Sequence, residues 1–282
     1  MRGPRLDRSE LEALLAEDAP HGDLTTSALA IDRRPAVMRF AARADMVVAG
    51  LDVACGLIEV AGGEARPIVE DGMAVEAGTA LLVAHGPAGV LHRAWKQAQT
   101  TVEILSGIAT AARAVVEAAA VDGRRVPVAC TRKTLAGSRR LMVGAVRAGG
   151  AIPHRLGLSE TVLVFAEHRT FLPDLSLVEM VARLREAAPE KKLVIEVASP
   201  REALAAAEAG FDVIQMEKFA PPEIARTVEL VKPRHPRVVL AAAGGIDPTN
   251  AGAHVAAGAD MLVTSWPYTA RPRDVQVRLE PV

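Results

Sequence analysis

The chain has 282 residues, half of them hydrophobic, so it is long enough to bury a large core and is not mainly disordered. Lys and Arg number 33 against 34 Asp and Glu, and this balance excludes a global field that would gather nucleic acid or anionic membrane. Aromatic residues make up only 3%, too few for the base-stacking surfaces of single-strand binders, so any function that depends on charge must be local.

Three further features predict a cytoplasmic protein. The basic start at Arg2 and Arg5 is not followed by an apolar stretch, so no signal peptide is predicted. No window of the sequence approaches the roughly 20 apolar residues of a spanning helix. Cys55 and Cys130 lie far apart and outside any CxxC pattern, which excludes a disulfide framework and a thiolate zinc site.

Residues 1–105 are expected to form a small α+β domain. A short helix is expected over residues 6–17, and the apolar runs that follow are short and separated by glycines such as Gly72, Gly78 and Gly86. That pattern is typical of a compact sheet. The C-terminal tail, residues 269–282, could return to this domain as an edge strand.

Residues 106–268 are expected to form an α/β barrel. Apolar, β-branched runs alternate there with Ala-, Leu- and Glu-rich stretches of helical periodicity, which predicts a parallel sheet with helices outside it. About six strands suit a (β/α) barrel, open or complete, better than a doubly wound sheet, because no GxGxxG follows the first strand. The six runs are residues 126–131, 162–166, 193–197, 213–216, 238–243 and 261–264.

The most informative feature is a basic segment. Residues 123–159 hold no Asp or Glu but eight Lys or Arg, in a chain whose charges are balanced as a whole. Because the chain is neutral and poor in aromatic residues, a pocket for a small polyanion is favoured over a nucleic-acid surface. Some of the eight could equally be solvated charges on helices. Those are Arg124, Arg125, Arg140 and Arg147.

Arg132 and Lys133 follow a predicted strand, where barrel enzymes gather their catalytic groups. Arg can hold a carboxylate or phosphate through two parallel hydrogen bonds, and Lys supplies a compact charge that suits a leaving group. His154 and Arg155 lie in a loop between two glycines and the next strand, so no helix face explains them. We predict that they contact an anion, although a lone His is more often a surface or packing residue.

Acidic residues occur at later strand ends, namely Glu196 and Glu217. A carboxylate in a cationic mouth is costly unless it binds a metal or balances positive charge that develops in the substrate, and both uses suit Mg²⁺ pyrophosphate chemistry. Ion pairs with the nearby Arg and Lys residues would satisfy them equally well.

A possible phosphate cradle follows the fifth predicted strand. Gly244 and Gly245 precede a helix expected to be capped by Asp247 with Pro248 in its first turn, and such turns expose backbone N–H groups. Thr264 and Ser265 end the next strand, so the two loops together resemble the phosphate site of late barrel strands. Glycine also serves ordinary strand-to-helix turns, so this signal alone is weak.

A cationic mouth, two carboxylates and a phosphate cradle together fit phosphoribosyl diphosphate. In transfer from that donor, Mg²⁺ and basic groups stabilise the departing pyrophosphate. Carboxylates can shield the oxocarbenium-like ribosyl centre while a nitrogen of the acceptor attacks it.

Five motifs now resemble the quinolinate phosphoribosyltransferase family in order and spacing over nearly the whole chain. The motifs are EDAPHGDLTT (17–26), LSGIAT (105–110), TRKT (131–134), RAGGAIPHRLGL (147–158) and AGGI (243–246). The resemblance implies an N-terminal α/β domain, an open α/β barrel, Mg²⁺-dependent use of phosphoribosyl diphosphate, and dimers whose sites take a residue from the neighbour.

The resemblance also implies roles for individual residues. It places Lys133 among the catalytic groups, with Glu196 and Glu217 near Mg²⁺ and the ribose. The residues it implies for the acceptor's carboxylates and the pyrophosphate are Arg132, Lys133, Arg139, His154 and Arg155.

Several positions depart from the family pattern. Lys96 stands where the family has an Arg that reaches into the partner's site, which keeps the charge but loses the bidentate fork. Phe165 replaces an active-site Lys, Glu217 replaces an Asp, and Ala243 stands at a Ser position. The changes gather at the predicted acceptor and phosphate sites, so they bear on the substrate rather than on the fold.

These departures resemble the ModD subgroup of the family, the pyrophosphorylases associated with molybdate transport genes. We therefore expect a phosphoribosyltransferase that joins a nitrogen heterocycle, carrying a carboxylate, to the donor ribose. Two alternatives remain open at this point. One is an ordinary quinolinate phosphoribosyltransferase of NAD biosynthesis, and the other is a non-catalytic anion-binding protein linked to molybdate.

Overall fold

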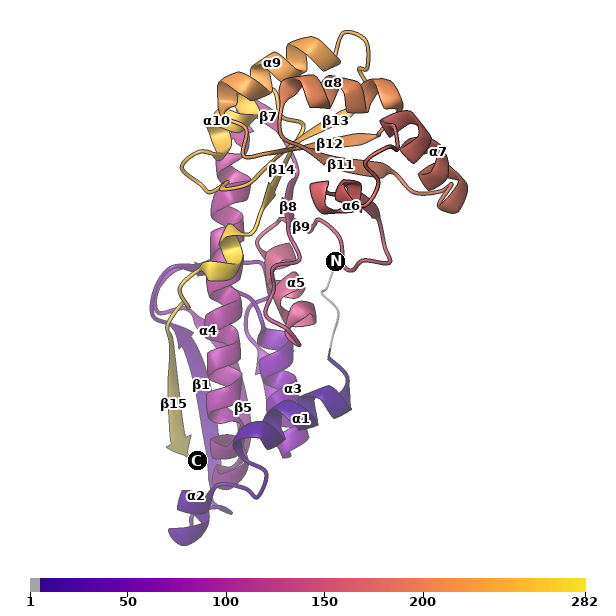
Figure 1. Cartoon of the computed structure of the whole chain (residues 1–282). Helices are drawn as coiled ribbons and strands as arrows, with labels where there is room; N and C mark the ends of the chain where they lie inside the picture. The colour runs from indigo at the N-terminus through magenta and orange to yellow at the C-terminus, as the bar shows by residue number, and fades with distance from the viewer. Residues whose placement is uncertain (1–5) are drawn as a thin grey trace. The chain divides into compact units, whose positions relative to one another are not determined.

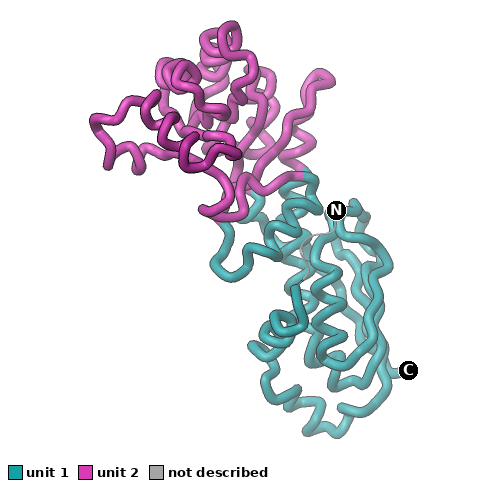
Figure 2. Tube along the Cα trace, turned by 90° about the vertical axis from the view of Figure 1, so that its right-hand side faces the viewer, with its two compact units in different colours: residues 1–113, 134–150, 267–282 teal, residues 114–133, 151–266 magenta. Residues whose placement is uncertain are grey.

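The computed structural model of the protein describes residues 6–282, so Arg2 and Arg5 lie outside the described residues. The chain divides into two compact units (Figure 2). Unit 1 comprises the chain up to Arg113, Thr134–Gly150 and Pro267–Val282, and unit 2 comprises Ala114–Lys133 and Ala151–Trp266. No helix within the described part is both long and apolar enough to cross a membrane.

Unit 1 is built on a four-stranded antiparallel sheet in the order β15-β1-β5-β3. The central strand β1 (Pro35–Ala42) pairs with β5 (Ala80–Pro87) and with β15 (Val275–Pro281), and β3 (Glu64–Pro67) lies beyond β5. The C-terminal tail is therefore an edge strand of this sheet (Figure 1). A separate short pair joins β2 (Met46–Val47) to β4 (Ala74–Val75).

Five helices belong wholly or partly to unit 1, and three of them, α1, α3 and α4, contribute buried side chains to a core that also includes Met38, Phe40 and Leu81. Helix α1 begins with a capping box formed by Asp7 and Glu10. Helix α4 is long and contains residue 105, where the sequence suggested a boundary. The helices are α1 (Arg8–Asp18), α2 (Leu24–Ala28), α3 (Leu51–Ala61), α4 (Ala88–Ala118) and α5 (Arg139–Ala148).

The start of α3 is capped from a distant turn. Its N-cap residue Gly50 has a φ of 92° and no side chain to accept a hydrogen bond. The Asp71 carboxylate accepts instead from the backbone N–H groups of Gly50 at 2.9 Å and Leu51 at 3.1 Å. Burial raises the pKa of Asp71, which these hydrogen bonds only partly offset.

Unit 2 contains a seven-stranded sheet in the order β10-β11-β12-β13-β14-β8-β9, and every neighbouring pair is parallel. The first and last strands do not pair with each other in the described structure, so the barrel is open. The strands are β8 (Val128–Cys130), β9 (Ile152–Pro153), β10 (Val162–Val164), β11 (Leu193–Val197), β12 (Val213–Glu217), β13 (Val239–Ala243) and β14 (Met261–Thr264). The predicted fold class is confirmed.

Six of these strands coincide with the six predicted runs. The seventh, β9, has only two residues and lies in the loop that was predicted to hold His154. Residues on alternate positions of the strands, such as Val194, Val213 and Ala241, pack together inside the sheet. The helices cover its outer face (Figure 1).

The remaining elements of unit 2 are short or lie outside the sheet. Helices α7, α8 and α9 follow successive strands, and β6 and β7 form a small hairpin. These elements are β6 (Ala120–Val121), β7 (Arg124–Arg125), α6 (Ala166–Thr170), α7 (Leu177–Ala187), α8 (Pro200–Ala209), α9 (Pro221–Val231), α10 (Ala251–Ala256) and the 3₁₀ turn η1 (Trp266–Thr269), which begins with the last residue of the unit.

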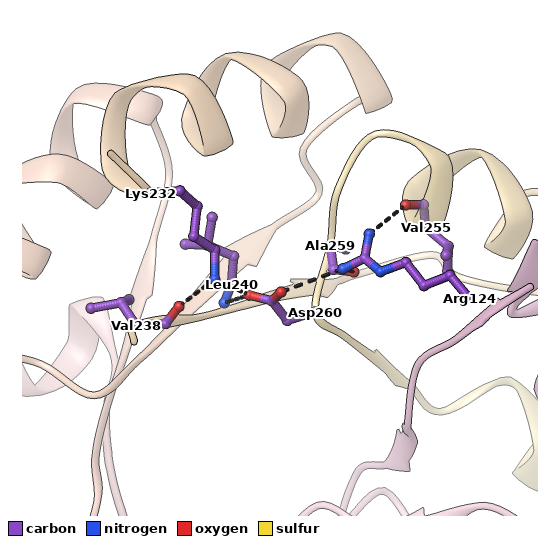
Figure 3. A network of polar contacts seen from close by, with 7 residues as sticks. All are labelled: Arg124, Lys232, Val238, Leu240, Val255, Ala259 and Asp260. Carbon is purple, nitrogen blue, oxygen red and sulfur yellow. Dashed lines mark hydrogen bonds and ion pairs between the residues drawn. The ribbon is translucent and has the colours of Figure 1, made fainter. Parts of the chain in front are cut away.

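One ion network ties these outer elements to the amino ends of two strands (Figure 3). The Asp260 carboxylate accepts from Lys232 Nζ at 2.6 Å, from Leu240 N at 2.9 Å and from Arg124 Nη2 at 3.4 Å. Arg124 also donates to the carbonyls of Val255 and Ala259. Arg124, one of the eight bases of the basic segment, therefore serves the packing of unit 2 rather than a ligand.

We predict that Asp260→Ala destabilises unit 2 by about 2–3 kcal/mol, because it leaves two cations and a strand N–H without their shared partner. The matched control is Asp274→Ala, which removes an exposed pair with Arg43. Its side chain is 63% exposed against 27% for Asp260, so its loss should cost under about 0.5 kcal/mol. Urea unfolding of the two variants measures both values, and equal losses would contradict the prediction.

Candidate active site

Most of the predicted site residues lie at one edge of the parallel sheet. Since all seven strands run in one direction, their carboxyl ends meet at the same edge, and each contributes one or two side chains or turns there. These residues all belong to unit 2. They are Arg132, Lys133, His154, Arg155, Phe165, Glu196, Glu217, Gly244, Gly245, Thr264 and Ser265.

The cationic part of this mouth comes from the neighbouring strands β8 and β9. Backbone pairing continues past the strands, because His154 N donates to Cys130 O at 2.8 Å, so Arg132 and Arg155 follow in register. Burial lowers the pKa of Arg155, and the charge of Arg132 lowers it further. The repulsion between these two neighbouring positive charges favours the binding of an anion beside them.

His154 has a different character from its neighbour. Burial lowers its pKa below the ordinary value of 6.5, and the charge of Arg155 adds to that effect. The imidazole is therefore mainly neutral at pH 7. It can offer a hydrogen bond to a ligand, but it adds little positive charge to the mouth.

Phe165 and Arg155 connect the two edges of the open sheet. Phe165 follows β10 at one edge and Arg155 follows β9 at the other, yet the Arg155 guanidinium lies 5.8 Å from the centre of the Phe165 ring. His168 stacks on the same ring at 5.8 Å between centroids and accepts from Phe165 N through Nδ1. The mouth therefore has an apolar wall that a cation covers.

Two carboxylates occupy the opposite side of the mouth. Glu196 and Glu217 lie on β11 and β12, and the Glu196 Oε2 atom accepts from Gln215 Nε2 at 2.7 Å. Burial, followed by repulsion from Glu217, raises the pKa of Glu196, although the Gln215 hydrogen bond lowers it. Within the described residues neither carboxylate forms an ion pair, so the alternative of ion pairing is not realised.

The carboxylate pair fits a divalent cation. Two repelling oxygen donors without a cationic partner would be stabilised by Mg²⁺, which usually takes one or two protein carboxylates and completes its shell with water and substrate phosphate. In the part of the chain that is described, no cluster of three or more His, Cys, Asp or Glu side chains forms a dedicated metal site.

The glycine turn has a geometry that differs from the sequence expectation. Gly244 and Gly245 have φ angles of 87° and 70°, which glycine adopts without strain. The expected helix capped by Asp247, with Pro248 in its first turn, is wrong, because α10 begins only at Ala251. Asp247 instead closes a turn through the N–H and hydroxyl of Thr249.

Thr264 is buried and its hydroxyl is already used within the turn. It donates to Ile246 O at 2.6 Å and accepts from Trp266 N at 3.0 Å, which joins the end of β14 to the glycine turn. Ser265, the next residue, is half-buried. A phosphate contact by either residue stays a prediction.

Two predicted residues belong to unit 1. Lys96 is exposed on α4, where its Nζ donates to Gln99 Oε1 at 3.1 Å and lies 4.7 Å from the Trp95 ring centre. Arg139 is the first residue of α5. Their parts in the site stay predictions. Unit 1 also has a cavity of about 690 Å³ between α1, α3 and α5, which none of the predicted site residues lines.

Gln215, the residue that holds Glu196, was not predicted from the sequence. Its one signal is a polar side chain in the otherwise apolar run of β12, two residues before Glu217 and therefore on the same face of the strand. Gln215 is only 6% exposed, and its Oε1 atom is buried without a hydrogen-bond partner. A buried amide of this kind indicates a polar function rather than packing.

Comparisons with known proteins agree with this arrangement. The family model for the N-terminal domain of quinolinate phosphoribosyl transferase matches residues 23–106, and the model for its C-terminal domain matches residues 108–278. A protein of Rhodobacter capsulatus named as a pyrophosphorylase, ModD, is 45% identical over 246 residues, which cover 87% of this chain and 95% of that one.

Two further proteins are similar over nearly their whole length. The nicotinate-nucleotide pyrophosphorylase (carboxylating) of Mycobacterium leprae is 32% identical over 278 residues, 96% of each chain. The crystal structure of NadC from Streptococcus pyogenes superimposes with a TM-score of 0.90 at 26% identity and covers 99% of both chains. The resemblance drawn from the motifs is thus confirmed, and the chain belongs to the quinolinate phosphoribosyl transferase family.

Proposed function

We propose that the protein transfers the phosphoribosyl group of phosphoribosyl diphosphate to a nitrogen heterocycle that carries a carboxylate but is not quinolinate. The observation that carries the proposal is the polarity of the barrel mouth, with cations after β8 and β9 and carboxylates on β11 and β12. A donor with an anionic leaving group and an electron-poor ribosyl centre matches that polarity.

In this reaction the bond between ribose C1 and the pyrophosphate oxygen breaks, and a bond from C1 to the acceptor nitrogen forms. Arg132, Lys133 and Arg155 would stabilise the charge that develops on pyrophosphate. Lys133 is exposed and can follow the leaving group, whereas Arg155 is buried and fixed. His154, being neutral, would donate a hydrogen bond to an oxygen of the donor or acceptor.

Glu196 and Glu217 would face the ribose. As carbocation character develops at C1, their charges would stabilise it, and Gln215 would keep one carboxylate oxygen in place. The same two carboxylates would hold Mg²⁺, which when bound supplies charge neutralisation for the pyrophosphate.

The charge that the acceptor can carry is constrained by Phe165 and by the Arg155 guanidinium that covers its ring. An apolar side chain at this place offers no charged contact to a second carboxylate, so it suits a heterocycle that presents one carboxylate to the bases rather than two adjacent ones. Quinolinate remains the second candidate, because the similar protein of Mycobacterium leprae is named as a carboxylating nicotinate-nucleotide pyrophosphorylase.

The proposal includes a homodimer, or a larger assembly of the same chain, that works in the cytoplasm. Lys96, which lies exposed on α4, would be contributed across the interface to the partner's site. In that role its charge would contact a carboxylate of the acceptor.

The direct test supplies purified protein with phosphoribosyl diphosphate, Mg²⁺ and quinolinate, and measures pyrophosphate and nicotinate mononucleotide. We expect the donor to bind but little nicotinate mononucleotide to form, and we expect pyrophosphate release with another member of a panel of heterocyclic monocarboxylates. Turnover of quinolinate at about 10 per second, the rate of a median enzyme, would establish quinolinate as the acceptor. Saturable binding without turnover of any acceptor would indicate a binding protein.

Phe165→Lys should raise turnover of quinolinate about tenfold, because it replaces part of the apolar wall with one charge-assisted contact to a second carboxylate. The control is Phe171→Lys, the same change at a side chain that is 83% exposed. Steady-state kinetics with quinolinate checks both variants. No gain in Phe165→Lys, or an equal gain in the control, would contradict this account of the acceptor.

A further inference from the structure

Lys218 has a backbone conformation that its residue type disfavours. Among the described residues only Ala30, Asp122 and Lys218 are non-glycine positions with positive φ, at 54°, 50° and 59°. Such angles cost an L-residue roughly 1–2 kcal/mol. A side chain kept at such a position therefore needs a reason.

The other two positions have a local explanation. Asp122 forms, with Gly123, the two-residue turn between β6 and β7, where positive φ is the rule. Ala30 follows the end of α2, a usual place for a left-handed residue. Lys218 instead follows directly after the buried strand β12, at the edge of the sheet where the candidate site lies.

Neighbouring groups hold Lys218 in this conformation. Its backbone N–H donates to Ala243 O at 2.7 Å, which ties it to the end of β13. Its stem packs against Gly244, since a Cβ on that residue would lie 2.7 Å from Lys218 Cγ. The same Cβ would lie 2.8 Å from Glu217 Oε1, so Lys218 and Glu217 both pack against the glycine turn.

The charge of Lys218 is not used within the fold. The residue is exposed, and within residues 6–282 no carboxylate lies within ion-pair distance of its ammonium group. The groups predicted to hold a phosphate at the turn beside it, Gly244, Gly245, Thr264 and Ser265, carry no charge. The one charged side chain between Gly245 and α10 is the carboxylate of Asp247, so the turn supplies no positive charge. A phosphate monoester bound only by such neutral groups would lack a counter-charge.

We propose that Lys218 binds the 5-phosphate of the sugar-phosphate donor over the Gly244–Gly245 turn, an assignment that rests on the proposed function. The strained backbone directs the stem across the turn, and the ammonium group supplies the charge that the turn lacks. Pyrophosphate, in contrast, would bind at the bases after β8 and β9. The two phosphate-bearing ends of the donor would thus bind to separate cationic groups.

Calorimetric titration of the full chain with ribose 5-phosphate and, separately, with pyrophosphate tests the assignment. Lys218→Gly should raise the Kd of ribose 5-phosphate about tenfold and leave that of pyrophosphate within about twofold. Its Tm should rise by about 2 °C, because glycine relieves the positive φ. A merely structural role of the lysine would not combine a gain in stability with a selective loss of affinity.

Three further variants complete the test. Lys218→Arg should retain the affinity for ribose 5-phosphate within about threefold, since the charge is kept. Lys192→Met removes an exposed lysine just before β11, at the opposite end of the sheet, and should change neither Kd. Asparagine tolerates positive φ but carries no charge, so Lys218→Asn should lose affinity for ribose 5-phosphate as the glycine variant does.

Unchanged binding of ribose 5-phosphate by Lys218→Gly and Lys218→Asn, or an equal loss for pyrophosphate, would overturn the assignment while the proposed function stands. If the unmodified protein binds neither phosphoribosyl diphosphate nor ribose 5-phosphate, the proposed function fails and the assignment fails with it.

Discussion

The common direction of the seven strands of unit 2 is the constraint on which the candidate site depends. Residues that are far apart in the chain, such as Arg132 and Glu217, meet only because every strand ends at the same edge. The hydrogen bonds between strands fix that edge, and the apolar side chains inside the sheet fix its register. The functional groups can then vary at the strand ends without disturbing the fold, which explains why departures from the family pattern gather there.

The same constraint separates charges of opposite sign within one mouth. Strands β8 and β9 carry the cations, and β11 and β12 carry the carboxylates, with the turns after β13 and β14, which contain no Lys or Arg, between them. Burial raises the pKa of Glu196 and lowers that of Arg155, and in each half the neighbouring like charge adds to the shift. This arrangement costs stability in the free protein and favours a ligand that is anionic at one end and develops positive charge at the other.

Much of this could be predicted from the sequence, because buried parallel strands form continuous β-branched runs with helical stretches between them. Six strands and the residues at their ends follow from that pattern. Strand β9 could not be predicted, since two residues in a glycine-rich loop carry no periodicity. The helix expected directly after Gly245 does not form there, because Asp247 and Pro248 also suit a turn that is not helical. Gln215 and Lys218 were missed because their importance lies in contacts across strands.

The contact that spans the gap between the two edges of the open barrel bears on which acceptor the site can bind. Its two edge strands do not pair, so side chains rather than backbone join them, and Arg155 over Phe165 is that junction. A residue in this place contacts whatever lies in the mouth and also spans the gap in the sheet. A lysine in place of Phe165 would face Arg155 with like charge and would need an anionic ligand to offset the repulsion. An aromatic residue needs no such ligand, so the contact between the two edges can be stable when the mouth is empty.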